Sequence, residues 1–100
     1  MRTIETVLHE ITDLKGQDNK AAFEKFLEVA DIGRRSSIKE AHIMGLLNAA
    51  ALACKMGNYD LSMKISTDAN AVDEGIWTEY LQEPHMQEML KALSDAGAFN

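Results

Sequence analysis

Cysteine is nearly absent from this 100-residue sequence, in which Cys54 is the only one. A single thiol excludes an internal disulfide framework and leaves no cysteine pair for a zinc site. The histidines, His9, His42 and His85, fall on different predicted helices and lack the spacing of metal ligands. We therefore expect no metal and no cofactor, and we expect Cys54 to be a small buried hydrophobe in a reducing compartment.

Long apolar runs are also lacking. No stretch approaches the roughly 18 consecutive apolar residues that suggest a membrane span. The opening residues, Met1 to Glu5, contain an acidic side chain and no apolar core, so we expect no signal peptide. The glycines are isolated, which argues against a phosphate-binding loop. These absences predict a cytoplasmic protein that makes no membrane contact.

Basic residues are scarce in the last third of the chain. Residues 1–64 hold nine acidic and nine basic side chains, whereas residues 65–100 hold seven acidic ones and a single base, Lys91. The whole net charge of −6 therefore lies in that third. Because binding to phosphate backbones needs clustered Lys and Arg, we expect no direct contact of this third with nucleic acid.

What the sequence does contain is a helical pattern of apolar residues, which make up 46% of the chain and suffice for one modest core. No segment alternates with period two. We predict an all-α protein, a single helical domain over residues 1–100. Short loops between the helices favour a compact antiparallel bundle. The six predicted helices cover residues 4–15, 19–32, 38–56, 59–70, 74–81 and 84–96.

Capping residues set these boundaries. Thr3, Asp18 and Asp73 are candidate N-caps, and Pro84 suits the first position of the last helix. A capping box is predicted at Ser37. The glycines at 16, 33, 57 and 97 are interpreted as helix stops.

Gly45 is the exception, because it lies inside the third and most apolar helix, which we expect to be central. Glycine costs roughly 1 kcal/mol there relative to alanine. The two interpretations are close packing against a neighbouring helix and a close contact with a partner's backbone.

Residues 43–74 resemble a single tetratricopeptide repeat. The likeness rests on the turn Lys55-Met56-Gly57-Asn58-Tyr59-Asp60 and on the small residues Ala50, Ser62 and Ala69. Leu46, Ala53, Ser66 and Glu74 depart from the family pattern, and the sequence has no second copy. The resemblance implies an antiparallel helical hairpin; the family binds peptides or helices in grooves that stacked repeats form.

The candidate partner-binding residues are acidic, aromatic and methionine side chains of the last third. Uncompensated carboxylates are either a solvated face or a patch that attracts a basic partner. Trp, Tyr and Met either complete the core or form the centre of an interface. The predicted site comprises Asp73, Glu74, Trp77, Glu79, Tyr80, Glu83, Met86 and Glu88.

The leading hypothesis is a non-catalytic protein-binding module, in one version a small acidic inhibitor that occupies a basic, nucleic-acid-handling site on its partner. In size, acidity and lack of catalytic motifs the chain is similar to small phage-encoded inhibitors of the anti-CRISPR type, with which it shares no motif. One alternative is a homodimeric adaptor or chaperone. The other is an enzyme or small-ligand binder that uses Cys54 or His42.

Overall fold

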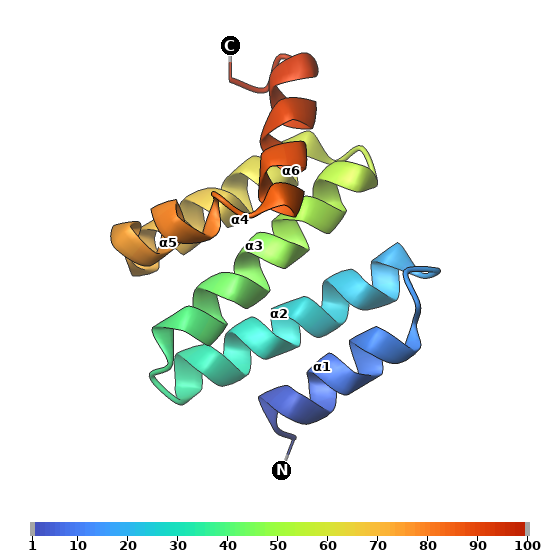
Figure 1. The fold of residues 1–100 in the computed structure, drawn as a ribbon, viewed down its shortest axis with the longest axis vertical. Coiled ribbons are helices and arrows are strands. Elements are labelled where there is room, and N and C mark those ends of the chain that lie inside the picture. The colour runs from blue at the N-terminus through green and yellow to red at the C-terminus, as the bar shows by residue number, and fades with distance from the viewer. Residues whose placement is uncertain (1, 100) are drawn as a thin grey trace.

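The computed structural model describes residues 2–99, which form six α-helices and no strand (Figure 1). The all-α prediction is confirmed. None of the helices in this part of the chain combines the length and the hydrophobicity that crossing a bilayer requires. The helices are α1 (Ile4–Asp13), α2 (Asn19–Arg35), α3 (Lys39–Lys55), α4 (Tyr59–Val72), α5 (Glu74–Tyr80) and α6 (Pro84–Asp95).

Most of the predicted helix ends are confirmed by their hydrogen bonds. Thr3, Asp18 and Asp73 each accept a hydrogen bond from a backbone N–H in the first turn of α1, α2 and α5, respectively. Pro84 is the first residue of α6. Gly57 follows α3 with φ +81°, a left-handed conformation that glycine adopts without strain.

The boundary between α2 and α3 was predicted wrongly. Gly33 does not end α2 but lies buried inside it, and the helix continues to Arg35. Ser37 caps nothing: it takes the left-handed position after α2, with φ +58°. The N–H of Ile38 donates to the carbonyl of Gly33 at 2.8 Å, and that of Ser37 to Arg34 at 3.3 Å. These two bonds make a Schellman motif, which satisfies the last carbonyls of α2 and uses Ser37 where glycine is usual.

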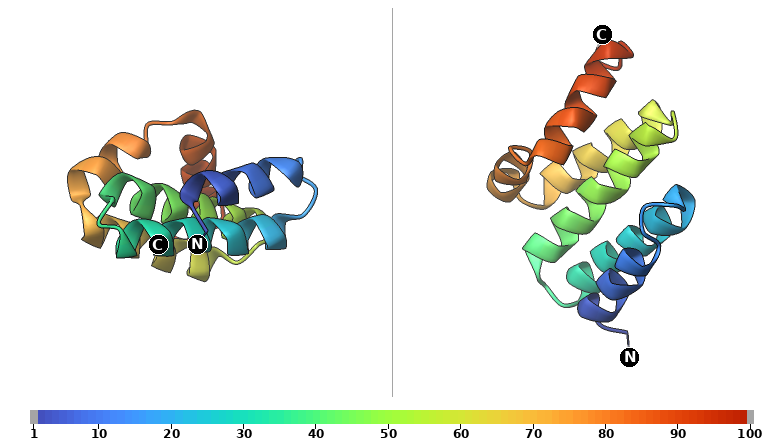
Figure 2. Two further views of the ribbon diagram at one scale, coloured as in Figure 1. Left: turned by 90° about the horizontal axis from the view of Figure 1, so that it is seen from below. Right: turned by 45° about the vertical axis from the view of Figure 1, so that its right-hand side comes forward.

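Helix α3 is central, as predicted, because it contacts α2, α4, α5 and α6. Seen from below, α1 and the α5–α6 segment stand on the same side of α2 and α3 (Figure 2). The Cα radius of gyration, 12.9 Å, is that of a compact chain of this length. Between these two groups of helices, residues of α3 line a surface depression.

The contact between α2 and α3 is a backbone-to-backbone approach. A Cβ atom at Gly45 would lie 2.5 Å from the backbone nitrogen of Ala30 and 2.7 Å from the carbonyl oxygen of Phe26. A Cβ at Gly33 would lie 2.6 Å from the backbone nitrogen of His42. Of the two interpretations of Gly45, close packing against a neighbouring helix is the correct one.

Two apolar clusters flank this contact. The larger joins α3, α4 and α6 and includes the fully buried Leu47, Met86 and Leu93. The smaller joins α1 to α2 through Val7 and Val29. The core thus consists of two clusters, one on each side of the close pairing of α2 and α3.

Residues 43–74 fold as the predicted helical hairpin, formed by α3 and α4. The small residues that carry the family resemblance, Ala50, Ser62 and Ala69, are fully buried between the helices. The Ser62 hydroxyl donates to the carbonyl of Ala50 at 2.8 Å, which satisfies a polar group inside the core. The hairpin is confirmed; its membership of the repeat family stays a prediction.

Replacing Gly45 with alanine is expected to destabilise the protein. The added methyl group would overlap backbone atoms of α2, and overpacking of this kind costs about 1–3 kcal/mol. That cost exceeds the gain in helix propensity of about 1 kcal/mol that alanine brings. Urea denaturation should therefore show a lower free energy of unfolding and a lower midpoint.

Gly75→Ala is the matched control for this substitution. Gly75 lies in α5, and a Cβ there would meet only a carboxylate oxygen of Asp73 at 3.4 Å. We expect it to be neutral or stabilising by up to about 1 kcal/mol. Equal stability changes in the two variants would contradict the close α2–α3 packing.

A charge cluster fastens the N-terminal segment to α1 and α2. The Arg2 guanidinium donates hydrogen bonds to the carboxylates of Glu10 and Glu28, and the Lys25 amine donates to Glu10 at 2.9 Å. Chiefly through Arg2 and then Lys25, these donors lower the pKa of Glu10 from 4.5 to about 2. The cluster adds ion pairs to the apolar contact between α1 and α2.

This cluster predicts a specific acid sensitivity. Because the folded-state pKa of Glu10 is lowered, its contribution to stability is complete above pH 4.5 and is lost as the pH falls toward about 2. Urea midpoints measured across this range should fall more steeply for the natural protein than for Glu10→Gln. Identical pH profiles would show that the cluster does not stabilise the fold.

Candidate functional site

A groove runs between the first half of α3 and the short helix α5. Its volume is about 650 Å³. We call it the α3/α5 groove. Its lining comes from Ile38, Glu40, Ala41 and Met44 on the α3 side and from Ile76, Glu79, Tyr80 and Glu83 on the α5 side.

The groove has an apolar floor and an acidic rim. Ile38, at the start of α3, is 43% exposed, whereas Met44 and Ile76 are partly buried and Ala41 is buried. Glu40, Glu79 and Glu83 are exposed, and the lining contains no basic residue. Among the described residues none of these three carboxylates has an ion-pair partner within 4 Å. The surface is therefore suited to cations that flank an apolar group.

The carboxylates of Glu79 and Glu83 lie near helix ends of opposite partial charge. Glu79 lies in the last turn of α5, where the partial negative charge of the helix end disfavours an anion. Glu83 is the N-cap residue of α6, where an anion is favoured, although its side chain makes no capping hydrogen bond. Neither carboxylate is needed to hold the helices, which leaves both available to a ligand.

Tyr80 fixes the α5 wall of the groove. Its hydroxyl accepts a hydrogen bond from the Asn48 side chain of α3 at 2.8 Å and lies 3.4 Å from Nε2 of His85. The rings of Tyr80 and His85 meet edge to face, with centroids 5.7 Å apart. Burial raises the pKa of Tyr80, and the nearby Glu83 carboxylate adds to the increase. Tyr80 is therefore a neutral, oriented side chain that links α3, α5 and α6.

Trp77 and Met86, both predicted as partner-binding residues, are placed elsewhere. Trp77 is half-buried against the larger apolar cluster, and its indole N–H donates to the Ser66 hydroxyl of α4 at 3.3 Å. Met86 is fully buried and completes the core between α3 and α6. Neither lines the groove, so of the predicted Trp, Tyr and Met centre only Tyr80 does.

The remaining predicted carboxylates are spread over several faces. Asp73 caps α5 and lies 3.7 Å from the Lys39 amine, so it is not uncompensated. Glu74 is exposed at the start of α5, outside the groove, and Glu88 lines a different depression. The structure thus brings together Glu79, Tyr80 and Glu83 and separates them from the rest of the predicted set.

Five of the eight groove residues lie outside the predicted site: Ile38, Glu40, Ala41, Met44 and Ile76. Glu40 belongs to the part of the chain whose charges balance, so a count along the sequence gives it no weight. Ile38, Ala41 and Met44 follow one another at three-residue spacing, which places them on one face of α3. That spacing was the available clue, but it does not distinguish a groove floor from ordinary core.

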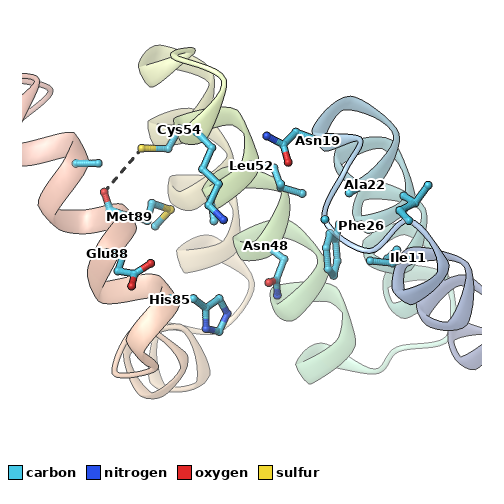
Figure 3. A pocket seen from close by; sticks show the side chains of 15 residues that line it. Ile11, Asn19, Ala22, Phe26, Asn48, Leu52, Cys54, His85, Glu88 and Met89 are labelled. Carbon is cyan, nitrogen blue, oxygen red and sulfur yellow. Dashed lines mark hydrogen bonds between the residues drawn. The ribbon is translucent and has the colours of Figure 1, made fainter.

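A second depression, of about 460 Å³, lies between α6 and the α1–α2 hairpin, with α3 as its floor. Figure 3 shows His85, Glu88 and Met89 of α6 on one side, Asn48 and Leu52 on the floor, and Ile11, Asn19, Ala22 and Phe26 on the opposite side. Charges of both signs, Lys55 and Glu88, line it. It therefore shows no preference for a ligand of one charge.

Cys54 borders this second depression without forming a nucleophilic site. The thiol is buried, lies 3.9 Å from the carbonyl oxygen of Met89, and has its pKa raised by burial. His42 lies twelve residues earlier on α3, about 18 Å away along a helix that rises 1.5 Å per residue. The two side chains cannot act as nucleophile and base on one substrate. Over residues 2–99, no three His, Cys, Asp or Glu side chains are arranged to hold a metal ion.

Comparison with known proteins does not extend these observations. No protein-family model matches the chain, no curated protein does so, and no solved structure matches its fold.

The burial of Cys54 predicts slow alkylation. Because reaction requires both exposure and the thiolate, iodoacetamide at neutral pH should modify the folded protein at least about tenfold more slowly than the urea-unfolded chain. His42→Ala should leave the folded rate unchanged. Rapid alkylation of the folded protein that slows in His42→Ala would instead support an activated thiol.

Proposed function

We propose that this protein is a non-catalytic protein-binding module whose binding surface is the α3/α5 groove. The observation that carries the proposal is the combination of an apolar floor, in which Ile38 is exposed and Met44 and Ile76 are partly exposed, with three exposed carboxylates that have no ion-pair partner among the described residues. Apolar surface in contact with water, and like charges without partners, both destabilise the isolated chain. A partner that covers the apolar surface and supplies opposite charges removes both effects.

The charge of the groove defines the partner it fits. Glu40, Glu79 and Glu83 present three negative charges around one apolar strip, within a chain of net charge −6. Such a surface speeds encounter with a basic partner and excludes an acidic one. We therefore propose a partner protein with a basic surface, and binding that weakens as salt screens the charges.

One concrete form of this function is inhibition in the cytoplasm. A basic surface that handles nucleic acid already attracts phosphates, and an acidic module of this size can occupy it in their place. The carboxylates of the groove would then stand where phosphates otherwise bind. A homodimer through this groove is disfavoured because each copy would bring three carboxylates to the same interface.

Site-specific photo-crosslinking tests the proposal. A benzophenone amino acid at position 38, inside the groove, should crosslink to one partner protein in an extract of the organism that encodes the chain. The same group at position 24, on the exposed side of α2, should not. Crosslinking should fall at high salt, and added nucleic acid should compete with it if the partner's nucleic-acid site is the target.

Paired charge variants show whether the groove itself is responsible. Glu79→Gln/Glu83→Gln removes two rim charges and should reduce crosslinking from position 38. Glu74→Gln/Glu88→Gln makes the same change in net charge outside the groove and should leave it unchanged. Equal yields in both double variants, or equal crosslinking from positions 24 and 38, would refute the groove as the binding surface.

A further inference from the structure

We propose that the partner segment seated in the α3/α5 groove is a short amphipathic helix with Lys or Arg on both sides of its apolar stripe. The inference rests on the proposed function, since it names what the same groove accepts. Three properties of the groove favour a helical occupant: its floor has few hydrogen-bonding groups, its carboxylates lie on both sides, and it is short.

The floor offers almost no hydrogen bonds to a ligand. It consists of the side chains of Ile38, Ala41, Met44 and Ile76 and the ring of Tyr80, whose hydroxyl is already engaged by Asn48. The backbone groups inside α3 and α5 are bonded within the helices, apart from the first N–H groups of α3, for which Ile38 provides no side-chain cap. The described residues contain no sheet edge. An extended segment would bury its own N–H and C=O groups without partners, whereas a helix satisfies them internally.

The carboxylates lie on both sides of this floor, which we call the α3 bank and the α5 bank. Glu40 belongs to the α3 bank, and Glu79 and Glu83 belong to the α5 bank. A helix that places apolar side chains on the floor directs its flanking positions toward the two banks. Cations on both flanks therefore pair with the rim, whereas cations on one flank leave the opposite bank unpaired.

The length of the groove limits the contact to about two turns. Helix α5 has seven residues, which corresponds to about 10 Å at 1.5 Å per residue. Apolar side chains at positions i, i+3 or i+4, and i+7 of the partner span that length. The groove is thus suited to three anchors from one face of a helix.

This chain does not supply such a helix to a second copy of itself. Most of its Lys and Arg residues that lie on helices are balanced by acids on the same helix, as in α2, where Asp31 pairs with both Arg34 and Arg35. Its last third is strongly acidic. The occupant is therefore a different, basic protein.

The test uses a synthetic amphipathic peptide of about fifteen residues, with leucines at helical spacing and lysines on both flanks. Binding is followed by amide chemical shifts of the full-length protein. Shifts should concentrate at Ala41, Met44 and Ile76. Glu40→Gln and Glu79→Gln should each lower affinity about 1.5- to 5-fold, the range for one exposed ion pair, and Glu74→Gln should not.

Two control peptides separate helix from charge. One carries a central proline, which breaks the helix at unchanged charge, and the other has the same composition with its leucines placed in alternation. Both should bind at least about tenfold more weakly, because neither presents a helical apolar stripe. Equal binding of either control would overturn the helical occupant.

The outcome for the helix is distinct from that for the groove. Suppose that position 38 crosslinks a partner. If no peptide then shifts the groove resonances, or if a control peptide binds as well as the helical one, the helical occupant is refuted. The groove would remain the binding surface. If position 38 crosslinks nothing and no peptide binds, both proposals fail.

Discussion

The close approach of α2 and α3 is the constraint on which the rest of the structure depends. Gly33 and Gly45 allow the two backbones to meet with no side chain between them, and methyl groups at either position would overlap backbone atoms of the other helix. Helices α4, α5 and α6 also pack against α3, and the α5–α6 segment lies on the same side of α2 and α3 as α1. The α3/α5 groove lies where α5 packs beside the first half of α3.

Helix α5 exists because tertiary contacts hold it. Seven residues are too few for a stable isolated helix, since nucleation costs more than so short a segment returns. Trp77 attaches it to α4, Tyr80 attaches it to α3, and Asp73 caps its start beside Lys39. Trp77 and Tyr80, which were candidate centres of an interface, therefore serve largely to attach α5 to the rest of the fold. They hold α5, and with it Glu79 and Ile76, against α3 and α4.

Most local interactions were predictable from the sequence, the capping box at Ser37 being an exception, whereas most contacts between distant helices were not. The N-caps at Thr3, Asp18 and Asp73 depend on atoms within a few residues, so the sequence identified them. Gly33 was interpreted as a helix stop because glycine serves both stops and close packing, and only the residues opposite decide between them. The same limit applies to the site: Glu79, Tyr80 and Glu83 were predicted, but Glu40, from the charge-balanced part of the chain, becomes part of the rim only through folding.

The distribution of carboxylates separates those that stabilise the fold from those that do not. The carboxylates of Glu10, Asp31 and Asp73 each form an ion pair with a basic side chain. These basic partners lower the pKa values of Glu10 and Asp31. Glu79 meets none and stands at the end of a helix, where its charge is unfavourable. A glutamine at this position would remove the unfavourable interaction of the charge with the helix end. A cation supplied from outside turns that unfavourable position into a favourable one, because the carboxylate and the helix end then attract the same charge.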